Sequence, residues 1–129
     1  MAPVPIIHIG ETLIATVQED LRDQDALGLQ QHLSERLVHT GARGVLLDLS
    51  VAETVDSFLG RLLGDIAAGA RLLGAHTVVV GIQPAVAITL VELGLELRGV
   101  YTALTVEKGL ARLRALLVQE ERLHGHRGQ

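Results

Sequence analysis

The sequence contains no cysteine and no tryptophan, and it has only one phenylalanine and one tyrosine. Without cysteine, the chain forms neither disulfides nor thiolate metal sites. Lysine is almost absent, because Lys108 is the single one, and the arginines are scattered in a chain of net charge −4. Duplex nucleic acid requires a basic surface, and single strands require aromatic side chains for base stacking. The composition therefore argues against nucleic acid as a partner.

The sequence also lacks a long uninterrupted hydrophobic run. Residues 77–91 carry no charge, but Gln83 and Pro84 divide them, and the stretch falls short of the ~20 apolar residues of a membrane span. The beginning, MAPVPIIHIGETLIA, has no basic region of the kind that opens a secretory signal. We therefore expect a cytoplasmic protein that does not associate with a membrane.

What the chain does contain is typical of one folded domain. Of its 129 residues 48% are hydrophobic and 20% are charged, which is a globular balance. We expect a domain over residues 1–120 and a solvated C-terminal tail over residues 121–129. His124 and His126 in that tail have no further ligands at a metal-binding spacing, and the glycines of residues 41–44 do not form a phosphate-binding loop. The sequence thus predicts no metal and no cofactor.

Hydrophobic periodicity predicts alternating strands and helices. Runs of β-branched and aliphatic residues predict strands within residues 4–10, 11–18, 44–50, 76–82 and 100–106. Steps of three and four residues predict helices that start near Asp23 or Asp25 and stop at Gly41, run from about Ser57 to Leu73, run from Pro84 to near Gly99, and begin again at Val106. The order β-β-α-β-α-β-α-β-α favours an α/β domain with a mostly parallel five-stranded sheet and four helices.

Ser57 stands where a predicted strand and its acidic turn lead into a helix, and chemistry in α/β sheets concentrates at such turns. Three roles are open for its hydroxyl. It can cap the helix, although Asp56 can do the same. It can act as a nucleophile, but the flanking glycines of a nucleophile elbow are missing and Asp56 disfavours negative charge on its oxygen. It can also accept a phosphate.

A phosphate on Ser57 would add about −1.5 to −2 charges at neutral pH, next to Asp56 and within a few residues of Glu53. The start of a helix tolerates an anion, so the fold would survive the modification. A partner that covers this turn would have to desolvate the dianion without a counter-ion, which costs several kcal/mol. Phe58 suits either the core or a contact with that partner.

The stretch GVLLDLSVAETVDSFLGRLL, residues 44–63, resembles the STAS domain family of anti-sigma factor antagonists, and within it the RsbS-like stressosome branch. The resemblance lies in the strand that ends at Asp48 and in the turn Val55-Asp56-Ser57-Phe58. Phe58 favours the RsbS-like branch, because simple anti-anti-sigma factors usually read Asp-Ser-Ser-Gly there. The resemblance implies that Ser57 is the phosphorylated residue, and we expect Asp56, Phe58, Glu53 and Asp48 to border the partner-binding surface.

The same resemblance implies a scaffold without enzymatic activity. The unphosphorylated protein would assemble with RsbR-type STAS paralogues, as a homodimer or higher oligomer, and would hold a serine/threonine kinase of the RsbT type. Phosphorylation of Ser57 would release the kinase into a stress sigma-factor pathway, and a PP2C-type phosphatase would reset the scaffold. The alternative is a direct anti-sigma factor antagonist. A hydrolase that uses Ser57 as its nucleophile is a distant third possibility.

Overall fold

The computed structural model describes residues 4–18, 21, 23–94, 97 and 99–127, the last four by their backbone alone. The predicted order of strands and helices is confirmed. The elements are β1 (Ile6–Ile9), β2 (Thr12–Thr16), α1 (Asp23–Thr40), β3 (Gly44–Asp48), α2 (Ser57–Leu72), β4 (His76–Val80), α3 (Pro84–Glu92), β5 (Val100–Ala103) and α4 (Val106–Arg127).

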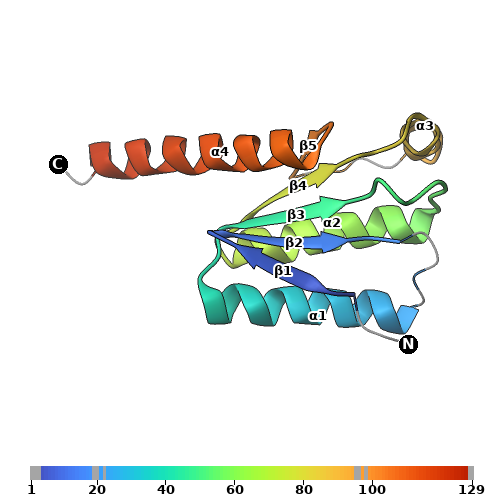
Figure 1. Ribbon diagram of the computed structural model, residues 1–129, viewed down its shortest axis with the longest axis horizontal. Helices are drawn as coiled ribbons and strands as arrows, with labels where there is room; N and C mark the ends of the chain where they lie inside the picture. Colours follow the sequence, from blue (N-terminus) through green and yellow to red (C-terminus); the bar gives the residue numbers. More distant parts are fainter. Residues whose placement is uncertain (1–3, 19–20, 22, 95–96, 98, 128–129) are drawn as a thin grey trace.

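The strands form one five-stranded sheet in the order β1-β2-β3-β4-β5. β1 pairs with β2 in antiparallel fashion, and the other three pairings are parallel. Figure 1 shows α1 and α2 side by side under one face of the sheet and α4 across the other face, while α3 lies beyond the carboxyl ends of the strands. The sheet is therefore mixed but mostly parallel, as predicted.

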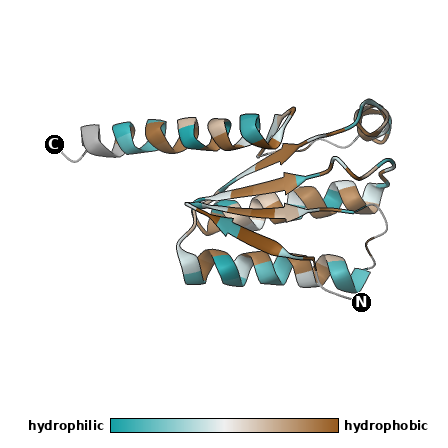
Figure 2. Ribbon diagram, in the orientation of Figure 1, coloured by the Kyte–Doolittle hydropathy of each residue, from teal (hydrophilic) through white to brown (hydrophobic). Residues whose placement is uncertain are grey.

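Two hydrophobic clusters fill the spaces on either side of the sheet. Because side chains alternate along a strand, Val45 and Leu47 of β3 enter the cluster with α1 and α2, whereas Leu46 enters the cluster with Leu113 of α4. All three side chains of β3 are fully buried. Figure 2 accordingly shows the central strands as hydrophobic, whereas hydrophilic and hydrophobic residues alternate along α1 and α4.

The third helix ends earlier than its sequence predicts. The prediction continued it towards Gly99, but α3 ends at Glu92 and Gly94 adopts a φ of +68°. In that left-handed conformation a glycine terminates a helix at little steric cost. The aliphatic residues that suggested a longer helix do not mark its end, and Leu95, which the prediction included, lies outside the described residues.

The fourth helix is fixed to the sheet by a polar contact as well as by its hydrophobic face. Glu120 accepts a hydrogen bond from Arg43, with 2.7 Å between Nη2 and Oε2, and also contacts the His76 ring. Burial alone would raise the pKa of Glu120, but the contacts with His76 and Arg43 outweigh it and the pKa is lowered. The helix continues to Arg127, so much of the segment expected as a tail is helical; a domain limit at residue 120 stays a prediction.

Gly109 allows α4 to approach the sheet closely. A Cβ atom at this position would lie 2.5 Å from Cγ1 of Val80 and 3.0 Å from Cδ1 of Leu46. Overpacking of this kind costs about 1–3 kcal/mol, more than the roughly 1 kcal/mol that alanine gains over glycine in a helix. We therefore expect Gly109→Ala to lower the free energy of unfolding by about 1 kcal/mol, measured by urea denaturation followed by circular dichroism.

Gly64 provides the matched control in α2, because a Cβ atom there would meet nothing within 4 Å. Gly64→Ala should raise the free energy of unfolding by about 0.5–1 kcal/mol through helix propensity alone. Equal changes in the two variants would contradict the close packing of α4 at Gly109.

Candidate functional site

The candidate site is the loop that leaves β3 at Asp48 and enters α2 at Ser57. Its beginning is anchored in the core, because Leu49 and Ala52 are fully buried. The Leu49 N–H donates to the carbonyl oxygen of Val80 over 2.9 Å, and the Ala52 N–H donates to that of Leu49 over 3.0 Å. The loop thus starts from a fixed position at the carboxyl edge of the sheet.

The loop also packs against the segment that follows β4. Gln83 donates from Nε2 to the carbonyl oxygen of Ser50 over 2.8 Å, and the Ser50 N–H donates to Oδ1 of Asp48 over 2.9 Å. Gly81 has a φ of +72°, and a Cβ atom on it would lie only 2.9 Å from Cβ of Ser50. Asp48 is half-buried and shapes this turn, so its carboxylate is engaged in local structure.

Asp56 is the N-cap of α2. Its backbone is extended, its side-chain Oδ1 accepts from the Leu59 N–H over 2.9 Å, and its carbonyl oxygen accepts from the Gly60 N–H over 3.1 Å. Of the two capping residues that the sequence left open, Asp56 is the one that accepts this bond. The hydroxyl of Ser57 makes no hydrogen bond within the described part of the chain and is exposed.

The remaining predicted site residues lie near this helix start. Glu53 is exposed in the loop before α2. Val55, which lies between Glu53 and the N-cap Asp56 in the chain, is half-buried against the core. Phe58 is 37% exposed, so it belongs neither fully to the core nor fully to the surface. The structure thus presents Asp56, Ser57 and Glu53 to solvent beside a partly exposed aromatic ring.

A groove begins at Phe58 and runs between α1 and α2. It has a volume of about 400 Å³ and is lined by Asp23, Ala26, Leu27, Gln30, Phe58, Arg61, Leu62 and Asp65. Leu27 is 57% exposed in it, whereas Ala26, Leu29, Leu33 and Leu37 of the same helix are buried. Sequence analysis missed this groove. Its signals were an apolar residue out of phase with the buried stripe of α1 and an arginine one turn after Ser57.

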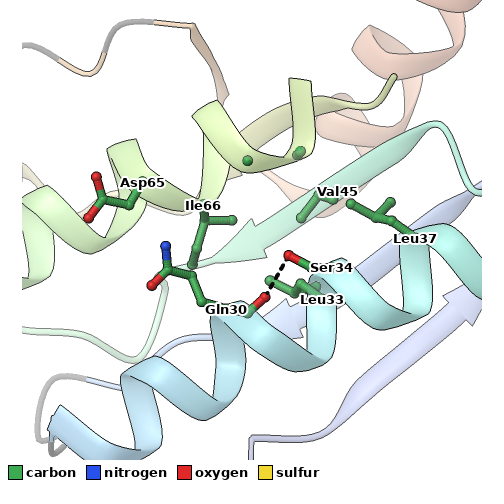
Figure 3. A pocket seen from close by; sticks show the side chains of 9 residues that line it. Gln30, Leu33, Ser34, Leu37, Val45, Asp65 and Ile66 are labelled. Carbon is green, nitrogen blue, oxygen red and sulfur yellow. Dashed lines mark hydrogen bonds between the residues drawn. The ribbon is translucent and has the colours of Figure 1, made fainter. Parts of the chain in front are cut away.

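A small cavity lies deeper between the same two helices (Figure 3). Its volume of about 30 Å³ leaves room for only a water molecule or two. Gln30 and Asp65 line both the cavity and the groove, and the Ser34 hydroxyl at the cavity donates to the Gln30 carbonyl oxygen over 3.0 Å. The cavity is too small for a substrate or cofactor.

The site has little of what serine catalysis requires. Over residues 4–18, 21, 23–94, 97 and 99–123, whose side chains the structure describes, no histidine is hydrogen-bonded to Ser57. The same part of the chain holds no group of three or more His, Asp or Glu side chains arranged for a metal ion. Nor does any described helix have the length and apolar character to cross a membrane. At the start of α2 the structure shows a hydroxyl that is exposed to solvent.

The cap and the hydroxyl can be separated by mutation. Asp56→Ala removes the acceptor of the Leu59 N–H and should lower the free energy of unfolding by about 1 kcal/mol. Ser57→Ala removes a hydroxyl without a hydrogen bond and should change it by less than about 0.5 kcal/mol. Urea denaturation of both variants checks this; a larger loss for Ser57→Ala than for Asp56→Ala would contradict the assignment of the cap.

Known proteins are similar to this chain in both sequence and fold. The family model of the STAS domain matches residues 4–108. The chain is 27% identical over 107 residues to the RsbT co-antagonist protein RsbRA of Bacillus subtilis (strain 168), covering 82% of this chain and 39% of RsbRA. It therefore spans well under half the length of that curated relative.

Solved structures agree with the family match. A variant of RsbS from Moorella thermoacetica, with a serine changed to glutamate, is 39% identical with a TM-score of 0.77, over 90% of this chain and 98% of that one. A chain from a structure of the stressosome, a signal integration and transduction hub, is 41% identical with a TM-score of 0.76, over 88% and 98%. The unphosphorylated anti-sigma factor antagonist SpoIIAA, at 14% identity and a TM-score of 0.69, shares the fold over 87% and 96%. Because the family model spans most of the chain and two close structural matches cover nearly all of it, this protein belongs to the STAS domain family.

Proposed function

We propose that this protein is a phosphorylation-switched scaffold of a stressosome-like complex. In its unphosphorylated form it assembles with RsbR-type STAS paralogues and holds a serine/threonine kinase of the RsbT type in the cytoplasm. The kinase phosphorylates Ser57, leaves the scaffold and acts on a stress sigma-factor pathway, and a PP2C-type phosphatase restores the hydroxyl. The chain itself performs no catalysis.

One observation carries the proposal: Ser57 is exposed at the start of α2 while the adjacent Asp56 does the capping. The hydroxyl can therefore be esterified without loss of a structural hydrogen bond. The phosphate adds about −1.5 to −2 charges beside the Asp56 carboxylate. A partner seated over Phe58 and this acidic turn would have to desolvate the phosphate beside the Asp56 carboxylate, which costs several kcal/mol. Binding then falls by a factor of hundreds or more.

The similarity to RsbS and to a stressosome chain supports the regulatory class and the assembly with paralogues. RsbRA is by its name a co-antagonist of RsbT, which supports a kinase of that type as the partner. Identity of about 40% over nearly the whole chain favours a scaffold of this kind. The second candidate, a direct anti-sigma factor antagonist, is favoured by the shared fold of SpoIIAA, at the much lower identity of 14%.

Phosphorylation should occur at Ser57. When the protein is incubated with an RsbT-type kinase and radiolabelled ATP, we expect one phosphate per chain and its loss in Ser57→Ala. Ser50 offers a matched control, because it is also exposed in the same loop and only its backbone is hydrogen-bonded. Ser50→Ala should be labelled like the unchanged protein; label that persists in Ser57→Ala would refute the site.

Charge at position 57 should also decide whether the kinase is held. Ser57→Ala should retain the kinase in a pull-down, whereas Ser57→Asp should weaken its capture at least tenfold, because the carboxylate carries part of the charge of a phosphate. Equal capture by the unchanged protein and both variants would argue against the switch.

The size of the assembly separates the two candidate functions. Mixed with RsbR-type paralogues and analysed by light scattering after gel filtration, a scaffold should elute as a particle of megadalton scale. A direct antagonist should instead form a one-to-one complex with an anti-sigma kinase and leave the paralogues unbound, and that result would replace the scaffold proposal by its alternative.

A further inference from the structure

Arg61 is an exposed cation one helical turn beyond Ser57. It lies on α2 at the position four residues after the serine and lines the groove between α1 and α2. Side chains four residues apart lie on one face of a helix, and each leans towards the helix N-terminus. The long side chain of Arg61, which lines the groove, can therefore reach back along the helix to Ser57.

Arg61 is also free to change partners. Within the described residues it forms no ion pair, although Asp65 follows four residues later on the same helix face and Asp23 of α1 lines the same groove. The only other basic residue of α2 is Arg71, in its last turn. A guanidinium without an ion pair in the described part of the chain thus lies one turn from the candidate phosphorylation site and in the same groove as two carboxylates.

We propose that Arg61 is the intramolecular counter-ion of the phosphate on Ser57 and that it turns from the groove towards the start of α2 when the phosphate is added. This inference rests on the phosphorylation proposed above. It makes Arg61 a positioning residue of the switch, since it acts by holding the new anion on the protein's own surface.

Arg61 should pair with the phosphate in preference to the neighbouring carboxylates for two reasons. It carries about twice the charge of Asp65, and its three oxygens accept a two-point contact from a guanidinium. The order along the helix also matters, because an anion that precedes a cation by four residues pairs better than one that follows it. Ser57 precedes Arg61, whereas Asp65 follows it.

The movement would change the groove as well as the helix start. Of its three charged lining residues, Asp23, Arg61 and Asp65, the single cation would leave and the two carboxylates would remain beside Phe58 and Leu27. A partner that contacts the groove would therefore meet an altered charge one turn away from the phosphate. Modification of one hydroxyl would therefore change the charge of the whole surface between α1 and α2.

The test uses the full chain with phosphoserine installed at position 57 by an expanded genetic code, so that no kinase is needed. Phosphorus-31 NMR then follows the second ionisation of the phosphate with pH. A nearby cation favours the dianion, so the titration midpoint of the unchanged chain should lie a few tenths of a pH unit below that of Arg61→Gln. High salt should narrow the difference.

Arg71→Gln is the matched control, since it removes an exposed arginine from the far end of the same helix, and its midpoint should equal that of the unchanged chain. Arg61→Lys keeps the charge and should retain part of the shift. Equal midpoints for the unchanged chain and Arg61→Gln would overturn the proposal.

A second measurement needs no substitution and serves if Arg61→Gln does not fold. In the phosphorylated chain, the Nε–H resonance of Arg61 should move with the midpoint of the phosphate while that of Arg71 stays in place; a stationary Arg61 resonance would also overturn the proposal. Because phosphoserine is incorporated during translation, these results do not depend on a kinase. Failure of the kinase to modify Ser57 would refute the proposed function and leave the contact with Arg61 standing.

Discussion

The hydrogen bond from the Leu59 N–H to Asp56 is the interaction on which the arrangement of the site depends. A helix start leaves backbone N–H groups without partners, and a capping side chain has to satisfy them. Because Asp56 does so, the neighbouring hydroxyl of Ser57 is left exposed and without a structural task. The same carboxylate keeps a negative charge beside that hydroxyl, where a further anion has its largest effect on a partner.

The loop before the cap is anchored to the sheet at its beginning. Leu49 and Ala52 bury their side chains in the core, and the close approach of Gly81 holds Ser50 against the segment after β4. The sheet therefore supplies a rigid base, and the acidic turn is displayed from it at the carboxyl ends of the parallel strands. A modification at Ser57 would alter the charge of the surface while leaving the hydrophobic clusters untouched, which is the property that a reversible switch requires.

The two ends of the sheet differ in character. At the carboxyl end, exposed acidic residues surround a hydroxyl and a groove that offers both apolar and charged contacts. At the opposite end, Arg43 and His76 hold Glu120 of α4, and these contacts keep the pKa of Glu120 low despite its burial. Charged side chains thus stabilise the position of a helix at one end, whereas at the other end Glu53 and Asp56 lie on the exposed surface around Ser57.

The sequence alone determined the order of elements, the α/β fold class and the position of Ser57 at a helix start, because these follow from local periodicity and from residues adjacent in the chain. Periodicity did not determine where α3 ends: its aliphatic composition continues past the point where Gly94 takes a left-handed conformation. Local pattern also left both Asp56 and Ser57 as caps, since both have suitable oxygens, and only the backbone geometry distinguished them.

The groove at Phe58 could not be foreseen, because it requires α1 to pack beside α2 and so brings Leu27 next to residues more than thirty positions away in the chain. For the same reason the sequence indicated only the spacing of Arg61 from Ser57 and not its position in the groove. Contacts between distant segments depend on the packing of whole helices on the sheet, and that packing is decided by the tertiary structure.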